Sequence, residues 1–214
     1  MSLFPQRLLE GYRTFTSHRL PTEQSRYREL AERGQSPEVM VIGCCDSRVS
    51  PEVIFDAGPG ELFVVRNVAN LVPVYQPDGG AHGVSAALEY AVQALRVNHI
   101  VVLGHAQCGG IRAFIDKIAP LSPGDFIGKW MSMFIKPGEM VEQRDHESMQ
   151  EFTARVEKAA VFRSLENLMT FPCVQILVER GKLHLHGAYF GVAEGSLSVL
   201  DPTSKEFRSV RESA

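Results

Sequence analysis

The sequence lacks a strong charge of one sign and any long apolar run. Its 214 residues carry a formal net charge of −3, so they provide no basic field for the phosphates of a nucleic acid. The longest apolar runs, such as HIVVLG at 99–104, are the size of strands and fall short of the ~18 apolar residues of a membrane-spanning helix. The first 20 residues also lack the apolar stretch of a signal peptide. We expect a cytoplasmic protein that binds a small molecule, with no nucleic-acid or membrane partner.

Cysteine is too scarce to build the fold. The chain has four cysteines, at positions 44, 45, 108 and 173. Adjacent Cys44 and Cys45 could be bridged only with strain, and a reducing compartment disfavours the other pairings. Hydrophobic residues make up 44% of the chain, so a core can form without disulfides. Metal binding or catalysis is therefore the better use of these thiols.

Strand and helix patterns alternate along the chain. Short apolar runs predict strands at 38–45, 62–69, 99–105 and 183–192, with a hairpin-like return through 195–202. Helical spacing predicts helices at 81–97, 109–118 and 172–181, a long polar helix at 146–169, and loops with short helices over 120–150. Residues 5–33 carry two helical patterns, with a break at Pro21 and Thr22 and a stop at Gly34.

This alternation predicts an α/β fold with a mainly parallel central sheet flanked by helices on both faces. No repeat and no linker divides the chain, so we expect a single domain over 1–214. Within it, residues 1–34 form an N-terminal helical arm and residues 35–214 form the α/β core. Ligands bind such sheets beyond the carboxyl ends of the strands, where the strings CCDSR and GHAQC both fall.

Three residues of these strings suit a metal ion. Cys44 closes the first strand, His105 closes the third, and Cys108 follows three residues later. Two thiolates and an imidazole suit tetrahedral zinc, and three protein ligands leave one position for a reactive water. Neighbouring residues of an extended chain point to opposite sides, so Cys45 is not expected to be the fourth ligand.

The residues beside these ligands suit the handling of a water molecule. Asp46 and Arg48 lie on the same side as Cys44 if the chain stays extended, and the arginine would keep the carboxylate ionised and oriented. Such a carboxylate can accept a hydrogen bond from zinc-bound water. Gly109 and Gly110 would let a small ligand approach the metal closely. This chemistry suits attack of water on a compact electrophile.

The two strings together resemble the beta-class carbonic anhydrases. The resemblance carries on through PGELFVVRNVANLVP at 59–73, GHAQCGGI at 104–111 and LHLHGAYFGVAEG at 183–195. It covers most of the chain, and the motifs, their order and the blocks between them agree together. It implies a dimer or higher homo-oligomer whose amino-terminal helices lie across a neighbouring subunit.

The resemblance also implies an activity and its residues. One zinc per chain would be bound by Cys44, His105 and Cys108, with Asp46 and Arg48 as the catalytic dyad. The reaction would be the reversible hydration of CO2 to bicarbonate and a proton, by attack of zinc-bound hydroxide. Two alternatives stay open: hydrolysis of carbonyl sulfide or carbon disulfide at the same zinc, and a non-catalytic zinc-stabilised module that binds bicarbonate or a partner.

Finer features resemble the plant-type branch of that family. The resemblance implies that Gln35, nine residues before Cys44, would hydrogen-bond the substrate. It also implies a substrate pocket that is partly supplied by the neighbouring subunit. The pocket residues it indicates are Gln35, Phe63, Val68, Tyr90 and Gly109. Val41 stands where the bicarbonate-regulated branch has tryptophan, which disfavours a regulatory bicarbonate site.

Other conspicuous residues favour plainer interpretations. Cys45 is expected to be a packed free thiol rather than a redox centre. His184 and His186 alternate along a predicted strand and could share a metal on one face, but packing in the strand or at an interface is the favoured interpretation.

Overall fold

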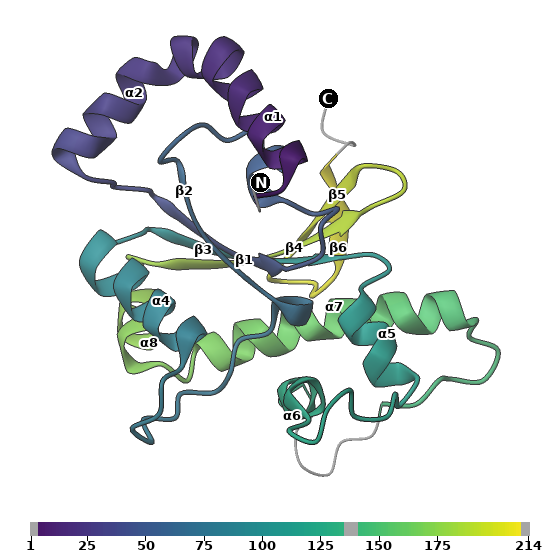
Figure 1. Cartoon of the computed structure of the whole chain (residues 1–214). Coiled ribbons are helices and arrows are strands. Elements are labelled where there is room, and N and C mark those ends of the chain that lie inside the picture. Colours follow the sequence, from purple (N-terminus) through teal and green to yellow (C-terminus); the bar gives the residue numbers. More distant parts are fainter. Residues whose placement is uncertain (1–3, 135–140, 211–214) are drawn as a thin grey trace.

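A six-stranded sheet organises the protein in this computed structural model, which describes residues 4–134 and 141–210 (Figure 1). The strands are β1 Val39–Cys44, β2 Leu62–Asn67, β3 His99–His105, β4 His184–Gly191, β5 Ser196–Leu200 and β6 Phe207–Ser209. They are ordered β2-β1-β3-β4-β5-β6. The first four are parallel, while β5 and β6 pair antiparallel. The predicted α/β fold with a mainly parallel sheet is confirmed, and β6 is a strand that the sequence patterns did not predict.

Helices of three kinds connect the strands. The α-helices are α1 Gln6–Thr14, α2 Leu20–Arg33, α3 Pro51–Ile54, α4 Gly83–Glu89, α5 Gly109–Ile115, α6 Phe126–Ser132, α7 Met149–Leu168 and α8 Pro172–Glu179. The π-helical turns are η1 Phe15–Arg19 and η3 Tyr90–Leu95, and η2 Val68–Asn70 is a 3-10 turn. Figure 1 shows α4, α7 and α8 together on one face of the sheet, and α5 packs against both α6 and α7.

Alternation along the strands divides the apolar side chains between the two sheet faces. On the helix-covered face, Ile100 and Val102 of β3 belong to a core with Leu88, Val161 and Val174 from the three covering helices. Each such fully buried side chain contributes about 1.5–3 kcal/mol. The opposite face has a smaller cluster in which few side chains are fully buried, namely Val41, Leu103 and Ala188.

Helix α7 is more buried than its sequence indicated. It begins with a capping box in which the Ser148 hydroxyl accepts from the Glu151 N–H and the Glu151 carboxylate accepts from the Ser148 N–H, which satisfies free donors at the helix start. The helix packs against β3 and β4. Its buried residues are Phe152, Val156, Glu157, Ala160, Val161, Ser164, Asn167 and Leu168. The predicted long helix is confirmed, and its buried face includes the polar residues Glu157, Ser164 and Asn167 as well as apolar ones.

The N-terminal arm is one bent helix rather than two. The predicted break at Pro21 and Thr22 was wrong: α1 passes through the π-helical turn η1 directly into α2. A π-turn followed by a proline is a common way for a helix to bend without ending. The predicted stop is confirmed at Gly34, which caps α2 with a φ of 80°. No residue of α1 or α2 is buried, and the arm arches over the open face of the sheet (Figure 1).

No helix in the described part of the chain is long and apolar enough to cross a membrane.

Candidate metal centre

Cys44, His105 and Cys108 converge at the carboxyl edge of the sheet. Their ligand atoms all lie within 4.8 Å of one another, and they are the one set of three such residues found in 4–134 and 141–210. The Cys44 and Cys108 sulfurs lie 3.9 Å apart. A tetrahedral zinc with Zn–S bonds of about 2.3 Å would place its two sulfurs about 3.8 Å apart. The cluster therefore has the size of a zinc site.

The sheet topology accounts for this convergence. Strands β1 and β3 pair in parallel, with Gly43 opposite Leu103, so Cys44 and His105 leave neighbouring strands at the same edge. A turn then follows in which Gln107 has a φ of 57°, and Cys108 is the N-cap of α5. All three ligands are thus fixed by the ends of regular elements, which suits a preformed site.

The imidazole of His105 is oriented as a metal ligand. Its Nδ1 lies 2.9 Å from the carbonyl oxygen of Ala106, so Nδ1 carries the proton and Nε2 has a free lone pair. Nε2 is buried and has no hydrogen-bond partner among the described residues, and a buried polar atom in that state is costly. A histidine that donates from one nitrogen to a carbonyl while the other binds a metal is the usual arrangement. A cation at this position would satisfy Nε2.

The two cysteine side chains are hydrogen-bonded to each other. Cys44 and Cys108 are 5% and 2% exposed. A hydrogen bond from the Cys108 thiol lowers the pKa of Cys44 to about 4, against the effect of burial. The same contact, together with burial, raises the pKa of Cys108 far above its usual range. The contact therefore favours ionisation of one of the two sulfurs, and a divalent cation would displace the thiol protons that remain.

Asp46 and Arg48 form a two-pronged ion pair beside the cluster. The Arg48 Nε and one of its terminal nitrogens donate to the two carboxylate oxygens of Asp46 at 2.8 and 2.7 Å. The other contact of that terminal nitrogen is the carbonyl of Gln107 at 2.9 Å, which ties the pair to the turn before Cys108. Hydrogen bonding from Arg48 holds the pKa of Asp46 well below its usual range. The carboxylate is therefore ionised and can only accept hydrogen bonds.

The reason for this pairing differs from the sequence-based one. We predicted an extended chain from Cys44 to Arg48, but the chain turns after Asp46, whose carbonyl accepts from the Val49 N–H at 3.1 Å. The Arg48 N–H also donates to the Asp46 carboxylate at 3.0 Å. Such a turn, in which an aspartate carboxylate accepts a hydrogen bond from the backbone N–H two residues later, is a common local motif. The turn, and not strand alternation, brings these two side chains together.

Sequence reasoning missed the residues that support this loop. Arg66 of β2 donates from Nε to the Cys44 carbonyl at 2.8 Å and from a terminal nitrogen to the Asp46 carbonyl at 2.6 Å. The Ala69 N–H points at the Cys44 sulfur at 3.4 Å, and Ala69 reaches this position with a φ of 62°. The contacts to Cys44 and Asp46 cross 20 to 25 positions of sequence, so no local pattern announces them.

A buried acid lies behind the cluster. Glu157 of α7 is 3% exposed. Its carboxylate accepts from the Cys108 N–H at 2.8 Å and from the Tyr189 hydroxyl at 2.6 Å. Burial raises the pKa of Glu157, while these hydrogen bonds act in the opposite direction. Glu157 thus fixes the backbone of Cys108, a role that its position within a long helix did not indicate.

The predicted pocket residues divide into two groups. Gly109 and Val68 lie beside the cluster: a side chain on Gly109 would meet open space, and Val68 packs with Cys44 and Cys108. Phe63 and Tyr90 pair with each other at 5.9 Å between ring centroids. Phe63 lies level with Met40 in the sheet, four residues and roughly 13 Å from the end of the strand.

Gln35 and Tyr90 are exposed in the single chain. Within residues 4–134 and 141–210, no hydrogen bond or ring contact links either of them or Phe63 to Cys44, His105 or Cys108. One chain therefore does not gather the whole predicted pocket.

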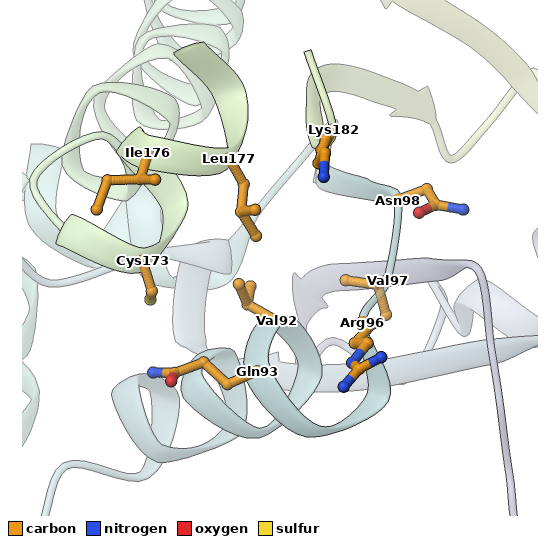
Figure 2. A pocket seen from close by; sticks show the side chains of 9 residues that line it. All are labelled: Val92, Gln93, Arg96, Val97, Asn98, Cys173, Ile176, Leu177 and Lys182. Atoms are coloured by element: carbon orange, nitrogen blue, oxygen red, sulfur yellow. The ribbon is translucent and has the colours of Figure 1, made fainter. Parts of the chain in front are cut away.

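The other cysteines lie outside the cluster. Cys45 is a free thiol, as predicted, but it is exposed, so the prediction that it is packed was wrong. Cys173 is a half-buried free thiol. Cys173 lines a cavity of about 480 Å³ between η3 and α8 (Figure 2). Asn98 also lines this cavity and directly precedes β3. The cavity therefore lies at the amino end of β3, opposite the edge where Cys44, His105 and Cys108 meet. A second cavity of about 550 Å³ is lined by Gln107, Gly109 and Glu157 and adjoins the cluster.

The chain is similar to carbonic anhydrases in sequence and in fold. A family model described as carbonic anhydrase matches residues 39–197. The chain is 37% identical over 205 residues to the carbonic anhydrase of Pseudomonas aeruginosa, with 96% of this chain and 91% of that protein covered.

Two solved structures show the same fold. The beta-carbonic anhydrase CcaA is similar with a TM-score of 0.87 at 29% identity, covering 95% of this chain and 91% of that chain. A tetrameric beta-carbonic anhydrase of Sordaria macrospora is similar with a TM-score of 0.73 at 26% identity, covering 91% of this chain and 95% of that chain.

Proposed function

The chain belongs to the beta-class carbonic anhydrases, and we propose that it catalyses the zinc-dependent, reversible hydration of CO2 to bicarbonate and a proton. The proposal is carried by the buried cluster of Cys44, His105 and Cys108. Among the described residues the Nε2 atom of His105 has no hydrogen-bond partner, so its lone pair is free to bind a cation. The donor set of two sulfurs and one nitrogen suits one Zn²⁺ per chain.

Zinc bound by these residues would act as a Lewis acid that lowers the pKa of water toward neutrality. The two cysteines would hold the metal as thiolates, and His105 would present Nε2 because Ala106 fixes its other nitrogen. Glu157 holds the backbone of Cys108 in place from behind. Three protein ligands leave room for a water at the fourth position.

Asp46 would orient the attacking water. Its carboxylate is ionised at neutral pH, and Arg48 lowers its pKa further, so it would accept a hydrogen bond from the water and direct the remaining lone pair toward CO2. Arg48 keeps the carboxylate in position through two parallel hydrogen bonds. We assign Asp46 and Arg48 as the catalytic dyad on this basis.

We infer that the enzyme is a homodimer or a higher homo-oligomer. The arm exposes Leu8, Tyr12 and Tyr27 at 56%, 64% and 39%, and the face of the sheet beneath it has an incompletely buried apolar cluster. A second copy of the chain would cover the exposed apolar residues of the arm and this apolar cluster. The same contact would bring Gln35, Phe63 and Tyr90 toward a neighbouring metal site, together with Val68 and Gly109 of that site. The tetrameric relative from Sordaria macrospora supports this proposal.

We place the enzyme in the cytoplasm, where a reducing environment keeps thiols free. All four cysteines are free thiols in the structure, and the proposed site needs two of them as metal ligands.

A stopped-flow assay of the zinc-loaded protein tests the proposed reaction. At pH 8 to 9 we expect CO2 hydration that is lost when a chelator removes the metal and returns when zinc is added. Parallel assays with carbonyl sulfide and carbon disulfide test the alternative hydrolase. No hydration of CO2 by zinc-loaded protein would refute the proposal, and hydrolysis of either sulfur gas in its place would assign the site to that alternative.

A further inference from the structure

Three histidines lie together at the end of the sheet opposite the zinc ligands. His99 begins β3 and His184 begins β4, and these two residues are directly opposite each other in the parallel pairing. His186 lies two residues further along β4, opposite Val101. Because side chains alternate along a strand, all three imidazoles project from one face, which is the face that Ala188 and Val101 also share.

The three rings are in contact with one another. The ring centroids of His99 and His184 are 5.3 Å apart and stacked at 28°, and those of His99 and His186 are 5.2 Å apart. The Nδ1 atom of His99 lies 3.1 Å from the Nε2 atom of His186. His184 and His186 are further apart, at 6.5 Å between centroids. His99 is therefore the centre of the group.

We propose that His99, His184 and His186 form a second metal site, which binds a divalent transition ion such as Ni²⁺, Cu²⁺ or Zn²⁺. Imidazole is a ligand that these ions share. With metal–nitrogen bonds of about 2.0–2.1 Å, two ligands of one ion lie about 2.9 Å apart in a square-planar site and about 3.4 Å apart in a tetrahedral one. The 3.1 Å between the two histidine nitrogens lies within that range.

The protonation state of His186 also favours metal binding. Burial, together with the neighbouring His99 and His184, lowers the pKa of His186, so this imidazole is neutral at physiological pH and has a lone pair to donate. An ion can bind both facing nitrogens once the ring that donates this hydrogen bond carries its N–H on its other nitrogen. His184 is exposed, and a turn of its side chain would bring it to the ion as a third ligand.

The two proposed metal sites differ in how many ligand atoms already lie in position. Among the residues in 4–134 and 141–210, the zinc ligands alone form a three-membered group within 4.8 Å. The histidine group has two nitrogens in position and a third on a movable ring. It therefore predicts weaker and exchangeable binding, in which His99 and His186 matter more than His184.

Calorimetric titration of the zinc-loaded protein with Ni²⁺ at pH 7.5 tests the proposal. We expect one Ni²⁺ per chain to bind while elemental analysis shows the original zinc retained. Binding to His186→Ala should weaken by at least about tenfold, since even loss of an outer partner of a metal ligand costs that much. His184→Ala should weaken binding less. The control is His18→Ala, which removes an exposed histidine of the arm and should change nothing.

A further variant separates metal binding from hydrogen bonding. In His186→Gln the amide can still exchange a hydrogen bond with His99, but it is a poor ligand for these ions. The proposal requires that His186→Gln lose Ni²⁺ binding as His186→Ala does, with thermal unfolding showing that both variants are folded. It is overturned if the unaltered protein takes up no Ni²⁺ beyond its zinc, or if His186→Gln binds Ni²⁺ as the unaltered protein does.

Discussion

His99 and His105 lie at the two ends of the same strand, about 20 Å apart, and their surroundings differ sharply. His105 is 1% exposed, with one nitrogen fixed by a carbonyl and the other facing two thiols. His99 is only partly buried and contacts two other imidazoles. The carboxyl end of β3 is thus a closed site held by several elements, while the amino end is an open one. The difference predicts tight, catalytic metal binding at one end and weak, exchangeable binding at the other.

The largest effect should follow from removing a ligand at the closed end. Cys44→Ser replaces a thiolate with a weakly acidic hydroxyl, and we expect zinc to be lost together with more than about 100-fold of the CO2 hydration activity, since even outer-shell changes cost 10–100-fold. Elemental analysis and stopped-flow assays measure both. Full zinc content with normal activity would remove Cys44 from the metal site.

Removing the charge beside the ligands should separate metal binding from catalysis. Asp46→Asn is expected to retain zinc, because none of the three ligands changes, yet to lose roughly 100-fold in kcat. The amide can no longer accept two hydrogen bonds from Arg48. Zinc content and kcat are measured on the same samples. Loss of zinc with loss of activity would instead make Asp46 a structural support of the cluster.

Glu157 should give a smaller effect that depends on pH. Burial raises the pKa of Glu157 in the folded protein. In the unfolded chain this carboxyl group ionises above about pH 4.3, while in the folded protein it ionises only at higher pH. As the pH rises from about 4.3 toward the pKa of Glu157 in the folded protein, ionisation therefore lowers the free energy of unfolding. Glu157→Gln cannot ionise at this position and does not lose that stability. We expect the stability of Glu157→Gln relative to the unaltered protein to increase over that window.

Urea unfolding of both proteins at a series of pH values measures this difference. The substitution also changes the hydrogen bonds to Cys108 and Tyr189, but this effect does not depend on pH. It therefore does not alter how the difference in unfolding free energy between the two proteins changes with pH. A difference that stays constant, or that falls as pH rises, would contradict the raised pKa of Glu157.

The smallest effect is expected at the residue that stands out most in the sequence. Cys45 is exposed and lies outside the ligand cluster, so Cys45→Ser should change zinc content and kcat by less than about twofold, as for a surface substitution remote from a site. The matched comparison is Cys44→Ser, one position earlier. Equal losses in the two variants would mean that both sulfurs contact the metal.

Much of this architecture follows from local patterns. Continuous apolar runs ending at Cys44 and at His105 predicted parallel strands, and parallel strands end at one edge. That argument alone brings the two ligands together, with Cys108 following in the next turn. Helical spacing likewise predicted the helices on the covered face of the sheet.

The rest depends on contacts that no local pattern encodes. Arg66 reaches the carbonyls of Cys44 and Asp46 across 22 and 20 positions, and Glu157 reaches Cys108 across 49. The bend of the arm at η1 arises from a change of backbone hydrogen bonding rather than from composition. The sequence favoured packing for His184 and His186, and His99 joins them only through the register of β3 and β4.

X-ray absorption at the zinc edge, on protein loaded with one zinc per chain, tests the closed site most directly. We predict two sulfur neighbours at about 2.3 Å and two nitrogen or oxygen neighbours at about 2.0 Å, and the same two sulfurs in Cys45→Ser. Three or more sulfurs, or a zinc surrounded by nitrogen and oxygen alone, would contradict the assignment of Cys44, His105 and Cys108 as the metal centre.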